Sequence, residues 1–155
     1  MRIEFTVFDT PPKKSGANSM WNSKSERSRI ISLRKKAYEA SLEYGEIVKK
    51  NYIGLEVILF IPNKKDIFRI GDLDNFIGGI CDGLQAASYS ALKYIDMKDK
   101  ELQNVYPHLP IFIENDNRVV FIKATKNYSK IEQIHYRIIL SFLSELNELD
   151  NELSE

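Results

Sequence analysis

The apolar run YIGLEVILFI, residues 52–61, constrains the fold of this chain more than any other stretch. It is rich in β-branched and aromatic residues, and Pro62 and Asn63 close it. Such a run predicts a buried β-strand. Because the backbone N–H and C=O groups of a buried strand must be paired, we expect the rest of the chain to supply partner strands.

Two further segments have clear strand character. Residues 2–8 alternate between apolar and polar side chains, and Pro11 and Pro12 follow them. Residues 118–124 (RVVFIKA) also predict a strand. The short apolar run 111–113 lies just before a turn signal at residues 114–117.

The stretch of residues 132–140 admits two interpretations. Ser129 and Glu132 have the spacing of a helical capping box, which favours a helix. The apolar residues from Ile134 onward alternate with polar ones, which favours a strand. We expect a strand here and a short acidic helix after it.

Two segments have helical periodicity. The first runs from about residue 25 to residue 44, with Gly45 as a stop signal. The second starts at Asn75 and is predicted to reach about Lys93, with its apolar residues on one face. Residues 94–110 have no clear pattern, and we interpret them as an insertion.

These elements predict an α+β (mixed α/β) fold. We expect a single small domain spanning residues 1–155, with a mixed sheet of about four to five strands packed against two or three helices. The composition, 43% hydrophobic, suffices for a real core. Trp21 and Cys81 are expected to pack in that core, with stacking on a nucleic-acid base as the alternative role of Trp21. Gly78 and Gly79 weaken the second helix, so another backbone, for example at a dimer interface, is expected close to them.

Several features bear on location. A single cysteine excludes an internal disulfide and favours a reducing, cytoplasmic location. No apolar run approaches the ~20 residues that cross a bilayer, and the N-terminus has no signal-peptide pattern. We therefore expect no membrane association.

The zero net charge conceals an asymmetry. Residues 1–50 contain eleven basic and six acidic residues, whereas residues 141–155 contain five acidic residues and no basic one. A basic loop, residues 13–29, contributes much of the positive charge. We interpret it either as a binding site for an anionic partner or as a solvated loop that binds no partner.

The most suggestive polar motif is GDLDN, residues 71–75. Asp72 and Asp74 directly precede a predicted helix, and Asp116 lies in a distant turn. Magnesium is commonly held by one or two carboxylates, water and substrate phosphate, so the three aspartates are candidate ligands. The same spacing is also typical of a helix cap, and from the residues alone both interpretations stand.

The motif Asp72-Leu73-Asp74-Asn75, with Asp82 and Leu84 downstream, resembles the D-L-D-N-x-x-K-x-x-x-D-x-L signature of RusA-type Holliday-junction resolvases (crossover junction endodeoxyribonucleases). The family's following D-D-x-Q-V segment is similar to residues 115–119. The chain departs from these patterns at Gly78, where the family has lysine, and at Asn115 and Arg118.

The resemblance implies a magnesium-dependent endonuclease that cuts branched DNA as a homodimer, with manganese able to substitute and no organic cofactor. It implies that Asp72, Asp74 and Asp116 are the catalytic metal ligands. The implied reaction is hydrolysis of a phosphodiester bond by an activated water, which leaves 5′-phosphate and 3′-hydroxyl ends. The alternative is a RusA-like protein that binds DNA junctions but cuts them weakly or not at all.

Other residues are expected to support this site. Asn75 would either hold the turn or an aspartate by hydrogen bonding or cap the helix. Asp82, about two helical turns after Asp74, would either support the ligands from behind or be structural. A cation in place of the lysine missing at Gly78 is expected from Lys123, Lys126 or the basic loop. The residues expected to contact DNA phosphates are Lys13, Lys14, Lys24, Arg27, Arg29, Lys123 and Lys126.

Overall fold

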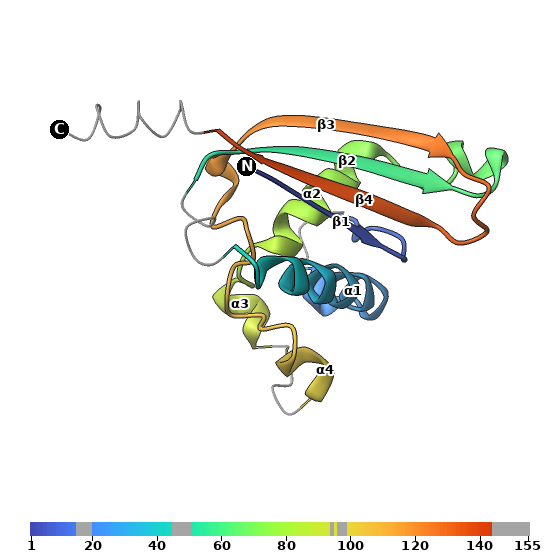
Figure 1. The fold of residues 1–155 in the computed structure, drawn as a ribbon. Coiled ribbons are helices and arrows are strands. Elements are labelled where there is room, and N and C mark those ends of the chain that lie inside the picture. The colour runs from blue at the N-terminus through green and yellow to red at the C-terminus, as the bar shows by residue number, and fades with distance from the viewer. Residues whose placement is uncertain (15–19, 45–50, 94, 96–98, 144–155) are drawn as a thin grey trace.

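The structure is a computed structural model, and it describes residues 1–14, 20–44, 51–93, 95 and 99–143. Its centre is a four-stranded mixed sheet in the order β1-β4-β2-β3 (Figure 1). β4 pairs antiparallel with both β1 and β2, whereas β2 and β3 are parallel. The strands are β1 (Arg2–Val7), β2 (Ile53–Ile61), β3 (Val119–Tyr128) and β4 (His135–Phe142).

Two longer helices cover one face of this sheet (Figure 1). They are α1 (Lys24–Ser41) and α2 (Leu73–Leu84). Within the described residues, two further α-helices are single turns, α3 (Tyr89–Leu92) and α4 (Lys100–Gln103). The expected α+β class is confirmed, with four α-helices in place of two or three. Short 3-10 turns complete the elements: η1 (Met20–Asn22), η3 (Lys64–Phe68) and η4 (Asp116–Arg118).

The main core lies between the sheet and the two long helices. Alternate residues of the strands point toward the helices because side chains of a strand alternate between its two faces. In β2 these are Leu55, Val57 and Leu59, and they pack in one cluster with Leu33 of α1 and Ile80 of α2. This arrangement explains why residues 53, 55, 57, 59 and 61 of the run are all apolar.

A second, smaller core lies around Trp21, beside the N-terminal half of α1. It includes Ile30 of α1 and buried residues of the α3 and α4 region, such as Ala91 and Leu102. The expectation that Trp21 is a core residue is confirmed, since its side chain is buried. Residues 94–110, expected as an insertion without clear structure, contain α4 and contribute to this core.

The predicted extent of the second helix was wrong. α2 ends at Leu84, well before Lys93, and Gln85 has extended backbone angles. The guanidinium of Arg34 accounts for this end, because one of its nitrogens donates to the carbonyls of Gly83 and Gln85 at 2.9 and 3.0 Å. A helix end satisfied in this way needs no continuation.

Other boundaries also differ from the prediction. β3 runs on to Tyr128 rather than residue 124, because it pairs with the whole length of β2, up to the register Ile61 with Tyr128. The strand interpretation of residues 132–140 is confirmed, with β4 shifted to His135–Phe142. Ser129 accepts a hydrogen bond from the N–H of Ile131 instead of capping a helix. The predicted acidic helix falls largely on residues 144–155, which lie outside the described part.

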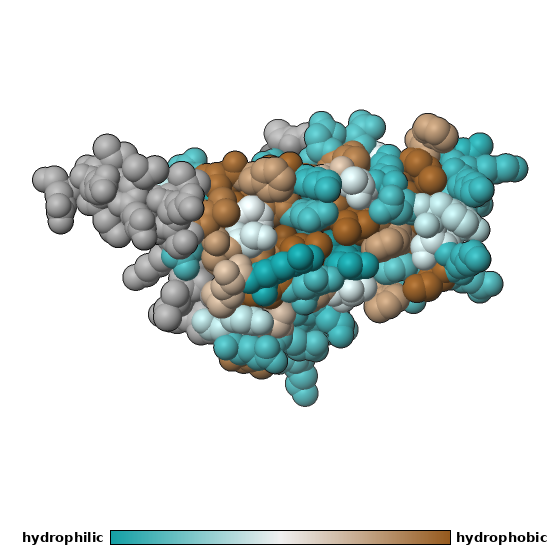
Figure 2. Space-filling view, turned by 45° about the horizontal axis from the view of Figure 1, so that its top comes forward, coloured by the Kyte–Doolittle hydropathy of each residue, from teal (hydrophilic) through white to brown (hydrophobic). Residues whose placement is uncertain are grey.

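The face of the sheet away from the helices carries mixed side chains (Figure 2). On this face the His135 ring is stacked between two phenylalanine rings. Its centroid is 5.1 Å from that of Phe8 and 4.7 Å from that of Phe60. His135 is buried between them, as a structural residue would be. None of the described helices is long and apolar enough to span a membrane.

Candidate functional site

The site begins where the chain enters α2. Asp72 occupies the N-cap position of this helix, and Asp74 lies in its first turn. Both residues are exposed. The Asp72 side chain makes no capping hydrogen bond, so the capping role considered for it is not used. Within the described part of the chain, neither carboxylate has a hydrogen-bond or ion-pair partner.

A glycine turn and two lysines lie directly before these aspartates. Gly71 has φ +131°, a backbone conformation that favours glycine. The ammonium of Lys126, on β3, donates to the carbonyls of Ile67 and Gly71. The Lys13 ammonium also lies beside Gly71, since a Cβ placed there would be 3.2 Å from its Nζ. Lys126 is therefore bonded to the loop that precedes Asp72.

Asp74 and Asp82 share one face of α2 with Gly78, and Gln85 follows on that side just after the helix ends. Asp74, Gly78, Asp82 and Gln85 are spaced by four, four and three residues, which places them in one row along a helix. The opposite side carries Phe76 and other residues of the main core. The motif therefore reaches the surface as a single polar row.

Lys14 crosses this row at its middle. Its backbone N–H donates to the carbonyl of Asn75 at 3.0 Å. Its side chain passes over Gly78, where an added Cβ would lie 3.4 Å from both Cβ and Cδ of Lys14. Its Nζ is 3.0 Å from Oδ2 of Asp82. The pKa of Lys14 is raised by the hydrogen bond and the charge of Asp82, with a smaller contribution from Asp116.

Asp116 lies at the other end of the row. It begins η4, is exposed, and accepts a hydrogen bond from Nε2 of Gln85. The same nitrogen donates to the carbonyl of Cys81 at 3.1 Å. Asp116 thus belongs with Gln85 and Asp82 near the C-terminal end of α2.

Asp74 and Asp116 are associated with opposite ends of this row. At ~1.5 Å rise per residue, the Cα atoms of Asp74 and Gln85, the residue that binds Asp116, are about 16 Å apart. In the described part of the chain, no three His, Cys, Asp or Glu side chains are grouped so as to hold a metal ion.

The two helix glycines have different neighbours. A Cβ on Gly79 would lie 2.0 Å from the carbonyl oxygen of Pro12, whereas Gly78 faces only the Lys14 side chain. The close approach of another backbone expected at this point is confirmed, and it comes from residues 12–13 of the same chain rather than from a dimer partner. Gly79 therefore allows Lys14 to reach the polar row.

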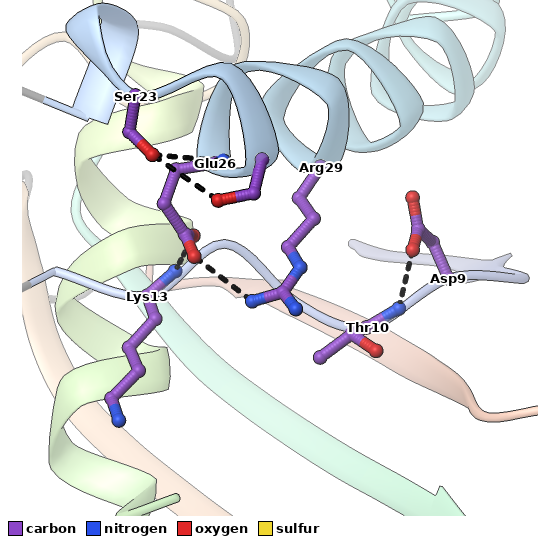
Figure 3. A network of polar contacts seen from close by, with 7 residues as sticks. Asp9, Thr10, Lys13, Ser23, Glu26 and Arg29 are labelled. Carbon is purple, nitrogen blue, oxygen red and sulfur yellow. Dashed lines mark hydrogen bonds and ion pairs between the residues drawn. The ribbon is translucent and has the colours of Figure 1, made fainter. Parts of the chain in front are cut away.

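The basic loop predicted at residues 13–29 is partly helical, because Ser23 accepts a hydrogen bond from the N–H of Glu26 and so starts α1. Figure 3 shows the resulting network around Glu26, whose carboxylate accepts from the Lys13 N–H at 2.6 Å and from Arg29 at 2.9 Å. The Lys13 side chain extends away from this network, beside α2 (Figure 3).

The remaining predicted DNA contacts differ in position. Arg27 donates to the carbonyl of Trp21 at 2.7 Å, so its guanidinium is held against η1. Lys24 is exposed at the start of α1. Lys123 pairs with Glu56 at 3.8 Å. Because Glu56 alternates with the buried residues of β2, Lys123 lies on the sheet face opposite α2.

Two residues of the site were missed in the sequence. Gln85 holds Asp116, and the buried guanidinium of Arg34 holds the backbone of Gln85. The other donors of Arg34 bind the carbonyls of Val105, Tyr106 and Leu109. An arginine on the apolar face of a predicted helix was the available signal, since a buried charge requires partners.

The position of Cys81 fits the core role expected for it. Its thiol is buried, and burial with the charges of Asp116 and Asp82 raises its pKa to about 12. A thiol in this state is a poor nucleophile and a poor metal ligand.

Neither a protein-family model nor a curated protein sequence matches this chain.

Proposed function

We propose that this protein is a magnesium-dependent endodeoxyribonuclease that hydrolyses phosphodiester bonds in branched DNA, as the RusA-type resolvases do. The observation that carries the proposal is the pair Asp72 and Asp74. Both carboxylates are exposed and take no partner from the described residues, although lysines lie close to the same turn. The similarity of the motif supplies the reaction class.

The donor set at this turn fits magnesium. The ion prefers carboxylate oxygens and commonly keeps waters and a substrate phosphate as its other ligands. Asp72 and Asp74 would hold it. When bound, the ion would activate a water and neutralise charge on the phosphoryl group. Asp116 is bonded to Gln85 through one carboxylate oxygen, and its assignment as a ligand stays a prediction.

The residues around the turn would position the substrate. Lys126 keeps the loop before Asp72 in place through two backbone carbonyls. Lys13 and Lys14 lie along α2, so their ammonium groups would meet the DNA backbone on the side of the two aspartates. Such contacts are independent of base sequence and weaken as salt concentration rises.

The first experiment tests cleavage of a synthetic four-way junction in magnesium. We expect the wild-type protein to cut it and Asp74→Asn to lose at least about a hundredfold in rate, because charge stabilisation of this kind is worth ~10²–10³ in rate. Equal rates for the two proteins would exclude Asp74 from the reaction.

A second experiment separates the roles of the three aspartates. Calorimetric titration with Mg²⁺ or Mn²⁺ should show saturable binding that is lost in Asp72→Asn and Asp74→Asn. Asp116→Asn decides whether the third carboxylate is a ligand: unchanged binding places it outside the metal site, and weakened binding brings it inside.

The separation of Asp116 from the other two aspartates favours one alternative function, a protein that binds DNA junctions and cuts them weakly or not at all. This alternative predicts a junction that shifts on a gel in calcium and stays intact in magnesium. Turnover of the junction would exclude it.

The proposal includes a homodimer. Two symmetric cuts across a two-fold junction need two sites, and a two-fold dimer supplies them. Light scattering of the purified chain, alone and with junction DNA, measures the mass directly. A mass of one chain per junction would contradict the dimer.

A further inference from the structure

The side chain of Lys14 is fixed in position along most of its length. Its backbone is bonded to Asn75, its aliphatic part lies on Gly78, and its ammonium is paired with Asp82. A Cβ on residue 78 would be in van der Waals contact with the Lys14 side chain. The positive charge of the polar row is therefore brought in from the N-terminal segment of the chain.

The ammonium of Lys14 is also accessible. Its side chain is 54% exposed, and that of Asp82 is 32% exposed. An exposed ion pair of this kind contributes little to stability and exchanges partners readily. A phosphate oxygen is a competent new partner for an ammonium group.

We propose that Lys14 binds the phosphate group at which the DNA is cut, and that Asp82 holds its ammonium until that phosphate arrives. This inference rests on the proposed nuclease function and assigns it a residue. The Lys14 backbone is bonded to Asn75, next to Asp74, and its aliphatic chain crosses Gly78 toward Asp82. An ammonium released from Asp82 would therefore turn back over Gly78 toward a phosphate held at Asp72 and Asp74.

The test compares single-turnover cleavage of a four-way junction by wild type, Lys14→Met and Lys36→Met. Lys36→Met is the matched control, because Lys36 forms an exposed ion pair with Glu39 on α1. We expect Lys14→Met to cut at least tenfold more slowly at saturating junction, and Lys36→Met to cut at the wild-type rate. Melting temperatures establish that each variant is folded.

A second measurement moves the positive charge from residue 14 to residue 78. In Lys14→Ala the space over Gly78 is open, so Gly78→Lys in that background restores a cation to the polar row. Gly78→Gln in the same background has similar length and helix propensity without the charge. We expect Lys, and not Gln, to recover at least part of the lost rate.

Three results would overturn the inference. Lys14→Met cutting as fast as Lys36→Met, while Asp74→Asn is inactive, would remove Lys14 and leave the nuclease function standing. If Gln and Lys at position 78 recover the cleavage rate equally, Lys14 contributes through packing and not through its charge. A wild-type protein that neither binds nor cuts the junction would remove the proposed function and this inference together.

Discussion

The guanidinium of Arg34 donates to the backbone carbonyl of Gln85 at 3.0 Å, at the residue where α2 ends. Gln85 in turn holds Asp116 through its side-chain amide. A residue that is fully buried in α1 thus determines where an exposed carboxylate of the candidate site lies. All five N–H donors of Arg34 are used, and all of them bind backbone carbonyls.

Replacing Arg34 should therefore be costly. Burial lowers the pKa of Arg34 to about 10, so the side chain remains charged at neutral pH. Arg34→Met leaves five carbonyls without their donor, and we expect a loss of about 3–5 kcal/mol in the free energy of unfolding. Arg34→Lys keeps the charge but has only three donors, so its loss should be smaller than that of Met. Urea denaturation measures both, and a Met variant as stable as wild type would contradict the role of these bonds.

Two glycines of α2, Gly78 and Gly79, should respond in opposite ways to alanine. Gly79→Ala brings a Cβ into the Pro12 carbonyl, so the segment before Lys14 must move. We expect it to destabilise the protein by about 1–3 kcal/mol, the usual cost of overpacking. Gly78→Ala meets only the flexible Lys14 side chain, and its higher helix propensity should stabilise by up to about 1 kcal/mol. Thermal denaturation of the pair tests the close approach directly, and equal melting temperatures would count against it.

The thiol of Cys81 should react slowly in the folded protein. Its pKa of about 12 compares with 9.0 for an unperturbed thiol, so at pH 8 its thiolate fraction is about a thousandfold lower. The raised pKa also means that the unfolded state loses its proton first, so stability is unaffected below pH 9 and falls as pH rises from 9 toward 12. The rates of reaction with a thiol reagent in native buffer and in guanidinium compare the folded and unfolded thiol. Comparable rates under the two conditions would contradict the burial of Cys81.

The hydroxyl of Tyr136 has no hydrogen-bond partner among the residues that the structure describes. Burial raises its pKa well above the ordinary value. Tyr136→Phe removes an unsatisfied polar atom, so we expect unchanged stability or a gain of up to about 1–2 kcal/mol. A loss larger than 1 kcal/mol in urea denaturation would indicate that the hydroxyl has a partner, such as a buried water.

Local patterns predicted the elements whose cause is local. Alternation identified β1, and a run of β-branched and aromatic residues identified β2. The predicted start of α1, about residue 25, lies within two residues of its N-cap, Ser23. The end of α2 was missed because its cause is Arg34, about fifty residues earlier in the chain. The Pro12–Gly79 approach was foreseen only as a need for space, since nothing local identifies the backbone that fills it.

The candidate site divides in the same way. The exposed pair Asp72 and Asp74 follows from the motif and the helix start that it marks. The contact of Asp116 with Gln85 joins residues 31 positions apart, and its distance from Asp74 depends on which end of α2 the η4 turn meets. Lys14 could be named as basic, but only the packed fold selects it from the seven cations considered.

The strand order has a consequence for how the protein is made. β1 is the first of the four described strands, but its partner in the sheet is β4, the last of them. β4 also lies between β1 and β2, so the two earlier strands have no ladder connecting them until residues 135–142 are present. Because a ribosome delivers the N-terminus first, the sheet is complete only after residues 135–142 have been made. Until then β1 lacks the strand that it pairs with here, and the segment that carries Lys14 follows a strand that has not yet docked.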